Sequence, residues 1–288
     1  MPLCRYLVAD SDQPRLGFIV GDRVIDSQRA GGPATMRQAL EMSRQDLLAE
    51  LAELAARQDG VPVADVTLRA PIDEQEVWAA GVTYLRSRDA RMEESTQKDV
   101  YDQVYEAERP ELFFKATAAR VAGPGEHVAI RADSTWDVPE PELALAINAL
   151  GEVVGFTVGN DVSSRSIEGE NPLYLPQAKL YARSASLGPV VATVDEVATP
   201  GALDIQLTIR RDGSVLFEEQ SSTARMHRSF DDLVAYLLRH NEYPAGVFLM
   251  TGTGIVPPSE FTLQDGDEVT IDIPGVGTLV NPILRLPA

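Results

Sequence analysis

From residue 110 to the end, the sequence is a succession of short apolar segments separated by glycine, proline and polar turns. These segments read HVAI, ELALAIN, VVGFTV, GPVVATV, DIQLTIRRDG, FLMTGTG and EVTIDIPGVGTLVNPI. Short strands bounded by such turns are typical of a sandwich or barrel, whereas a parallel sheet needs helices between its strands. The clearest regular helix of this part is expected at residues 230–240. The pattern therefore predicts a β-rich fold for most of the chain.

The first 66 residues mix strands and helices. Short strands are expected near the N-terminus, with a hairpin at Gly21. Residues 35–58 place apolar side chains three or four positions apart, which predicts one or two helices, and Thr35 is a suitable N-cap. We therefore expect a small α+β domain over residues 1–66 and a larger domain over residues 67–288.

Residues 86–109 form a highly charged segment, RSRDARMEESTQKDVYDQVYEAER. The segment is expected to be helical, but it lacks a strong apolar face, which favours a solvated helix pair. A weakly packed segment of this kind can also serve as an active-site lid. The two interpretations are compatible.

The net charge of −19 bears on which macromolecular partners the protein can have. A surface of this charge repels nucleic acid and anionic membranes, so neither is expected as a partner. No apolar stretch approaches the roughly 18 residues that a membrane-spanning helix requires. The single cysteine, Cys4, rules out an internal disulfide, and the N-terminus shows no signal-peptide pattern. A cytoplasmic location is therefore expected.

Three carboxylates stand at the ends of two neighbouring apolar strands in the segment WDVPEPELALAINALGEVVGFTVGND. Glu140 and Glu142 are two residues apart, so their side chains share one face of a strand. If the hairpin pairs residue 148 with residue 153, Glu140 falls opposite Asp161 and all three carboxylates cluster on one face. A slip of one residue would send Asp161 to the other face.

Three carboxylates so close together repel one another, so either one is protonated or a cation lies among them. A divalent metal ion is the economical answer. An all-oxygen ligand set without nearby cysteine or histidine selects Mg²⁺, Mn²⁺ or Ca²⁺ over Zn²⁺. The alternative is that the two glutamates lie on a half-exposed strand and face water, which is common for this spacing. The apolar run ELALAI favours burial, and hence the metal.

Two lysines and one further glutamate lie in apolar segments. Lys179 is the only charged residue between Glu170 and Arg183. A lysine in such surroundings can have a lowered pKa and act as a base, although most reach the surface. In PELFFKA, Glu111 and Lys115 share a strand face beside two phenylalanines. The simplest interpretation of that pair is an ordinary salt bridge.

Together these motifs resemble the fumarylacetoacetate hydrolase superfamily over roughly residues 75–288. The resemblance rests on PELFFKA, the two glutamates, NDVSSR with Asp161, Lys179 before SLGP, TGTG around Thr253 and the ending GDEVTIDIPGVGTLVNP. It implies a β-sandwich-roll core within a β-rich α+β protein, assembled as a dimer or tetramer. It also implies a Mg²⁺ or Mn²⁺ site made by the two glutamates and the aspartate, with Lys179 beside the metal and Thr253 near the substrate carboxylate.

One departure from the family pattern bears on the reaction. The hydrolases carry a His–Glu pair that activates water, whereas this chain reads GVTYLRSRDA, with Ser87 at the histidine position and Ala90 at the glutamate position. Glu93 and Glu94 follow, without a histidine. By contrast, GVTYLRSR, DVSSRSIEGENPLYLPQAKLY and DVYDQVYEAERPELFFKA resemble the 2-keto-3-deoxy-pentonate dehydratases of this superfamily.

The resulting hypothesis is a metal-dependent dehydratase that converts a 2-keto-3-deoxy-pentonate, of the arabinonate or xylonate type, into 2,5-dioxopentanoate. Lys179 is the candidate base at C3 and Glu111 the candidate acid at the departing C4 hydroxyl, although the two roles could be exchanged. Contacts with the 2-keto acid substrate are expected from Lys115, Thr253, Arg86 and Tyr84.

Two other functions stay open. An acylpyruvate-type C–C hydrolase of the same fold would need a water-activating base, for which only Glu93 or Glu94 is available. A non-catalytic binding protein for sugar acids would keep the metal site without turnover. Hydrolysis of 2,4-diketo acids would reveal the first function, and binding of keto acid and metal without turnover would support the second.

Overall fold

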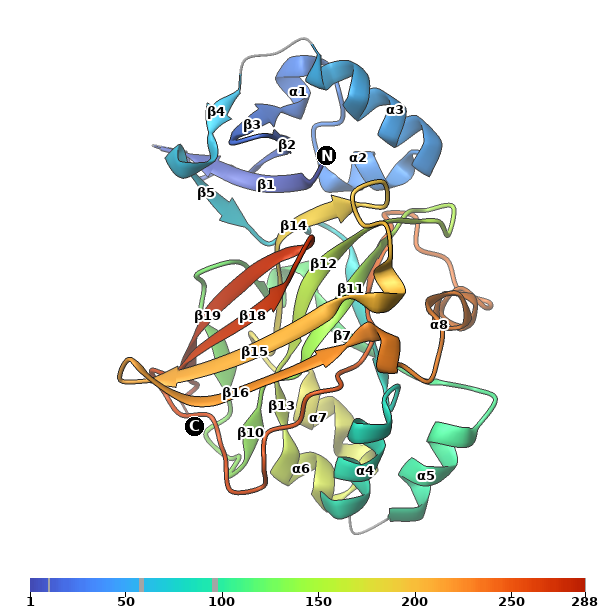
Figure 1. Cartoon of the computed structure of the whole chain (residues 1–288), viewed down its shortest axis with the longest axis vertical. Coiled ribbons are helices and arrows are strands. Elements are labelled where there is room, and N and C mark those ends of the chain that lie inside the picture. The colour runs from blue at the N-terminus through green and yellow to red at the C-terminus, as the bar shows by residue number, and fades with distance from the viewer. Residues whose placement is uncertain (10, 57–59, 95–97, 288) are drawn as a thin grey trace.

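Strands dominate the computed structural model, which describes residues 1–9, 11–56, 60–94 and 98–287 (Figure 1). The β-rich α+β class predicted from the sequence is confirmed. Most strands belong to one large mixed sheet: Leu3–Val8 (β1), Arg15–Val20 (β2), Arg23–Asp26 (β3), Val61–Pro62 (β4), Val66–Arg69 (β5), Glu76–Gly81 (β6), Glu111–Thr117 (β7), Val121–Ala122 (β8), Pro141–Ile147 (β11), Val153–Asp161 (β12), Ala185–Thr193 (β14) and Val247–Met250 (β17). Its main path is β4–β3–β2–β1–β14–β12–β11–β17–β6–β7, with β5 on β1 and β8 on β14.

A second sheet lies against the large one. It has the order β16–β15–β18–β19–β9 and contains Val128–Ile130 (β9), Asp204–Arg211 (β15), Ser214–Ser222 (β16), Glu268–Ile273 (β18) and Gly277–Arg285 (β19). Asp137–Val138 (β10) and Ser163–Ser164 (β13) pair separately. Strand β16 was not expected, because its largely exposed, polar sequence SVLFEEQSS lacks the apolar alternation of a core strand.

The helices are short and lie around the sheets. They are Ser27–Ala30 (α1), Met36–Glu41 (α2), Arg44–Ala55 (α3), Leu85–Glu94 (α4), Lys98–Glu106 (α5), Arg165–Glu170 (α6), Leu175–Lys179 (α7) and Phe230–Leu237 (α8). The predicted helical segment 35–58 is two helices, and the Thr35 side chain caps the first by accepting from the Gln38 N–H. Within the described ranges, no helix is long and apolar enough to cross a membrane.

Strand β11 is buried along its whole length because both of its faces are covered. Leu143 and Leu145 pack into the core between the two sheets, whereas Ala144 and Ala146 belong to the core on the other face. This alternation follows from the period of two in a strand. The apolar run ELALAI is therefore a central strand, as its composition indicated.

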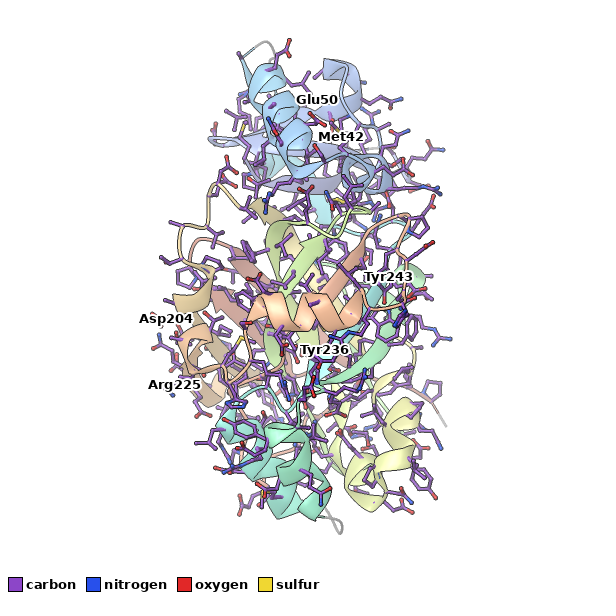
Figure 2. The ribbon with its side chains drawn as sticks, turned by 90° about the vertical axis from the view of Figure 1, so that its right-hand side faces the viewer. Met42, Glu50, Asp204, Arg225, Tyr236 and Tyr243 are labelled. Atoms are coloured by element: carbon purple, nitrogen blue, oxygen red, sulfur yellow. The ribbon has the colours of Figure 1, made fainter. Side chains whose placement is uncertain are left out.

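The N-terminal strands and helices gather at one end of the molecule, and α4 to α7 lie at the other (Figure 1). Strand β1 pairs with β14 at Leu3 and Val191, and β5 pairs with β1, so backbone hydrogen bonding continues from the N-terminal strands into the core. The domain division at residue 66 stays a prediction. Helix α8 lies across one side of the core, where Leu233 and Leu237 are buried against it (Figure 2).

Candidate metal centre and active site

The hairpin β11–β12 brings the three predicted carboxylates together. The Asp161 N–H donates to the Glu140 carbonyl at 3.0 Å, so these two residues lie opposite each other as predicted. At the turn of the hairpin the register differs from the prediction, because Val153 pairs with Ile147 and not with residue 148. A β-bulge after Ala146 takes up the extra residue and restores the alignment at the other end.

Glu140, Glu142 and Asp161 form a buried cluster. Each offers a carboxylate oxygen, these oxygens all lie within 4.8 Å of one another, and no residue of the three is more than 4% exposed. The half-exposed alternative is therefore wrong for these glutamates. Three carboxylate oxygens in one small volume are the donor set that Mg²⁺ and Mn²⁺ favour.

The surroundings of Glu142 test whether a cation fits. Burial raises the pKa of Glu142 well above its usual range, and the charges of Asp161 and Glu140 raise it further. The Gly252 N–H donates to its carboxylate at 2.6 Å, but no lysine or arginine of the described chain forms an ion pair with it. The cluster thus has an uncompensated carboxylate where a divalent ion would bind.

Lys179, the last residue of α7, points into the cluster instead of reaching the surface. Its Nζ donates to Glu140 at 2.8 Å, to Asp161 at 2.9 Å and to the Ser163 hydroxyl at 2.7 Å. Burial alone lowers the pKa of Lys179, but the charges of Asp161 and Glu140 outweigh burial, and the net pKa lies above its usual range. The expectation of a lowered pKa is therefore wrong for the protein without a cation in the cluster.

Lys115 is buried behind Asp161, with which it forms an ion pair. Its Nζ also donates to the carbonyls of Val162 and Lys179, at 3.1 and 2.5 Å. Burial lowers the pKa of Lys115. The predicted salt bridge with Glu111 is wrong, because Glu111 has no ion pair among the described residues.

The carboxyl of Glu111 opens into the same cavity as the cluster. Burial raises its pKa to about 7, and the nearby charge of Glu168 adds to the shift. Gly81, opposite Glu111 in the β6–β7 pair, leaves the room for it: a Cβ on Gly81 would lie 2.1 Å from a Glu111 carboxylate oxygen. A carboxyl with this pKa can hold or release a proton near neutral pH.

Three charged residues of the site were missed by the sequence reasoning. Arg91 of α4 and Arg165 of α6 each donate to Glu140 at 2.9 Å, and Arg91 also pairs with Glu168 of α6. Burial raises the pKa of Glu140, but Lys179 and these arginines outweigh it and hold the pKa below its usual range. The segment of Arg91 was interpreted as a solvated helix and the helix of Arg165 and Glu168 was not predicted, so no local signal distinguished these residues.

Three of the four predicted substrate contacts line one of two cavities, whereas Lys115 lines neither. Thr253 lines the cavity of the cluster, and its hydroxyl is engaged with the backbone of Ile255. Tyr84 and Arg86 line a neighbouring cavity of about 370 Å³. The buried Tyr84 hydroxyl has no hydrogen-bond partner in the described chain, and its pKa is raised by burial and by the charge of Glu142. Whether these residues contact substrate stays a prediction.

The positions of the hydrolase pair carry no water-activating group. Ser87 closes the first turn of α4 by hydrogen bonding to the Tyr84 backbone, and Ala90 is a buried core residue. The side chains of Glu93 and Glu94, the remaining candidates, lie outside the described residues. The cavity of the cluster has a volume of only about 20 Å³, which is the size of a water site.

Comparison with known proteins assigns the family. Residues 76–284 match the family model described as fumarylacetoacetate (FAA) hydrolase C-terminal. A probable 2-keto-3-deoxyxylonate dehydratase from Haloferax volcanii is 48% identical over 279 residues, covering 97% of this chain and 95% of the relative. The 2-dehydro-3-deoxy-D-arabinonate dehydratase of Saccharolobus solfataricus is 45% identical over 227 residues, covering 77% of this chain and 76% of the relative.

A solved structure of a dehydratase is similar to this chain over its whole length. It is a 2-keto-3-deoxy-D-arabinonate dehydratase complexed with magnesium and 2,5-dioxopentanoate, with a TM-score of 0.82, 35% identity and complete coverage of both chains. The family model covers most of the chain, and the first of these relatives spans nearly all of it. The chain belongs to the fumarylacetoacetate hydrolase family.

Proposed function

We propose that this protein is a metal-dependent dehydratase, a hydro-lyase that converts a 2-keto-3-deoxy-pentonate into 2,5-dioxopentanoate and water. One observation carries the proposal: the Glu111 carboxyl, which has no ion pair among the described residues and a pKa of about 7, lines a small cavity together with Lys179, Glu140 and Asp161. Elimination of water from a 3-deoxy-2-keto acid needs one group to take a proton and another to give one. The dehydratase relatives and the magnesium-bound neighbour support this reaction.

Glu140, Glu142 and Asp161 would hold the cofactor, Mg²⁺ or Mn²⁺. When bound, the ion supplies a Lewis acid that polarises the 2-keto group, and its charge offsets the carboxylates that otherwise keep Lys179 protonated. Lys115 and Lys179 supply further positive charge, which a protein of net charge −19 needs at the place where it binds an anionic substrate.

The two proton transfers are assigned to Lys179 and Glu111. Lys179 takes a proton from C3, the C4–oxygen bond breaks, and Glu111 gives its proton to the departing hydroxyl, which leaves as water. The enone that results loses a C5 proton, regains a proton at C3 and tautomerises to the aldehyde. The product therefore has the composition of the substrate minus one water.

Substrate entry requires the cavity to widen, because about 20 Å³ cannot hold a five-carbon acid. Arg91 of α4 closes one wall by its ion pairs with Glu140 and Glu168. We propose α4, with α5 beside it, as the wall that moves. The Arg228 side chain donates to the carbonyls of Val104 and Ala107, and movement of α5 would have to break these hydrogen bonds.

The hydrolase alternative is not supported, because Ser87 and Ala90 replace its water-activating pair and the two relatives described above are dehydratases. We also propose that the protein is cytoplasmic and assembles as a dimer or tetramer. Light scattering of the purified protein would test the assembly.

The decisive experiment is turnover of 2-keto-3-deoxy-D-pentonate with Mg²⁺ and with EDTA. The product is read through a coupled aldehyde dehydrogenase. Mg²⁺-dependent formation of 2,5-dioxopentanoate is the expected result. Absence of product with metal bound would reject the dehydratase, and binding without turnover of any keto acid would favour a binding protein.

A further inference from the structure

A second, larger cavity lies at the junction between the N-terminal strands and the core. Its volume is about 570 Å³, and it shares no lining residue with the cavity of the carboxylate cluster. Its charged lining comes from separate parts of the chain: Arg5 of β1, Arg69 of β5, Arg120, Glu126, His127 and Arg183. A volume of this size suits a small-molecule ligand.

The charge of this lining is opposite to that of the protein. Four arginines face one glutamate in a chain with 25 basic and 44 acidic residues. Glu126 is already engaged, because it pairs with Arg69 and accepts from the Gly123 N–H at 2.7 Å. Burial lowers the pKa of the Arg5 guanidinium; the carboxylate of Asp73 opposes this shift, and the neighbouring charge of Arg69 adds to it. The cavity thus concentrates positive charge that its own glutamate does not neutralise.

Two nitrogen-bearing side chains of the lining have N–H donors that no described residue accepts from. The Arg183 side chain has no hydrogen bond, ion pair or ring contact in the described part of the chain, and neither does that of His127. Arg183 also has a φ of 57°, a left-handed conformation that non-glycine residues adopt at a cost. Arg120 uses one nitrogen to donate to the Leu180 carbonyl at 3.0 Å, which leaves its other N–H groups for a ligand.

We propose that this cavity binds a small organic polyanion, carrying either phosphate or several carboxylate groups. Guanidinium groups bind both kinds of anion through paired N–H donors. A ligand with two or more negative charges fits better than a monoanion, because three arginines besides the Arg69–Glu126 pair line the cavity. The proposed substrate is a monoanion and is assigned to the other cavity.

The wall of this cavity is continuous with the segment that carries Lys179. Arg120 holds the carbonyl of Leu180, the next residue, and Lys115 holds the carbonyl of Lys179 itself. Arg183 follows four residues after Lys179. An anion that engages Arg120 and Arg183 therefore acts on the backbone that positions Lys179, and we expect it to change turnover; this last part rests on the proposed function.

The test is isothermal titration of the Mg²⁺-loaded protein with tricarballylate and with inorganic phosphate, with acetate at matched ionic strength as the monoanion control. We expect saturable binding of a polyanion, and the tighter probe identifies the preferred chemistry. Arg183→Gln should weaken binding about tenfold or more. Its unpaired side chain makes this change safe for folding. Arg239→Gln is the matched control, because Arg239 stacks on Tyr236 of α8, outside the cavity.

Several outcomes would contradict the proposal that this cavity binds a polyanion. They are no saturable binding of either probe, equal weakening by the control variant, or an Arg183→Gln protein that binds anions normally. A change of oligomeric state in Arg183→Gln without any effect on anions would assign the cavity to a second copy of the chain. Polyanion binding with unchanged turnover of the 2-keto acid would overturn only the link to Lys179. Failure of the dehydratase assay itself would leave the titration result unaffected.

Discussion

Replacing Glu111 with Gln tests the proposed acid most directly. The amide keeps the size of the side chain and the space beside Gly81, but it cannot give a proton. Loss of a positioned general acid costs roughly a hundred- to ten-thousand-fold in rate. We therefore expect kcat to fall within that range while Mg²⁺ affinity stays close to that of the parent protein.

The pKa of Glu111 sets the pH dependence. With a pKa of about 7, half of these carboxyls are protonated at pH 7 and about one in a hundred at pH 9. An acid acts only when protonated, so kcat of the parent protein should fall about tenfold per pH unit above its pKa. A bound cation nearby moves this fall in kcat, the alkaline limb of the pH profile, to lower pH, because positive charge lowers the pKa of an acid. In Glu111→Gln the limb should disappear.

The same shift makes the contribution of Glu111 to folding stability fall as the pH rises, in the same direction as kcat. The folded-state pKa of Glu111 lies above the ordinary 4.5, so the native state holds its proton more tightly than the unfolded state. The contribution of Glu111 to the free energy of unfolding is therefore fully present below pH 4.5 and is lost as the pH rises through 7. The 2.5-unit difference corresponds to at most about 3 kcal/mol, which Glu111→Gln should restore above pH 7.

The assays are kcat against pH with saturating Mg²⁺, and denaturant unfolding of the metal-free protein at pH 5 and pH 8. Glu106→Gln, on the exposed side of α5, serves as the control in both. Near-normal kcat in Glu111→Gln, or an unchanged alkaline limb, would refute the assignment of the acid. A variant that is inactive and also less stable at pH 8 would show that Glu111 is needed for folding instead.

Three further substitutions test the rest of the site. Lys179→Met should abolish turnover. The variant should still bind Mg²⁺ at least as tightly, measured by calorimetry, because Glu140 and Asp161 lose their ammonium partner. Normal turnover would contradict the assignment of Lys179 as the base. Glu142→Gln should weaken Mg²⁺ binding at least about tenfold, and unchanged affinity would count against the cluster as the metal site. Gly81→Ala should lower kcat more than Mg²⁺ affinity, because its Cβ would displace the Glu111 carboxylate; normal kcat would contradict that packing.

Local sequence patterns were sufficient to predict many of the strands and helices. Strand alternation and turn residues identified most of the core strands, and the spacing of apolar residues identified α2, α3 and α8. The edge strand β16 escaped because an exposed strand needs no apolar face. The short helices α6 and α7 escaped because they cover less than the span over which helical periodicity becomes visible.

The carboxylate cluster was predictable from the residues, because the period of two puts Glu140 and Glu142 on one strand face and a hairpin in the right register brings Asp161 opposite. The position of Lys179 beside the cluster was implied only by the family resemblance. Which charges meet follows from the packing of distant elements. Lys115 pairs with Asp161 and not with Glu111, and the arginines of α4 and α6 converge on Glu140. Such pairings depend on how distant elements pack, and proton affinities depend on the burial and neighbouring charges that packing creates.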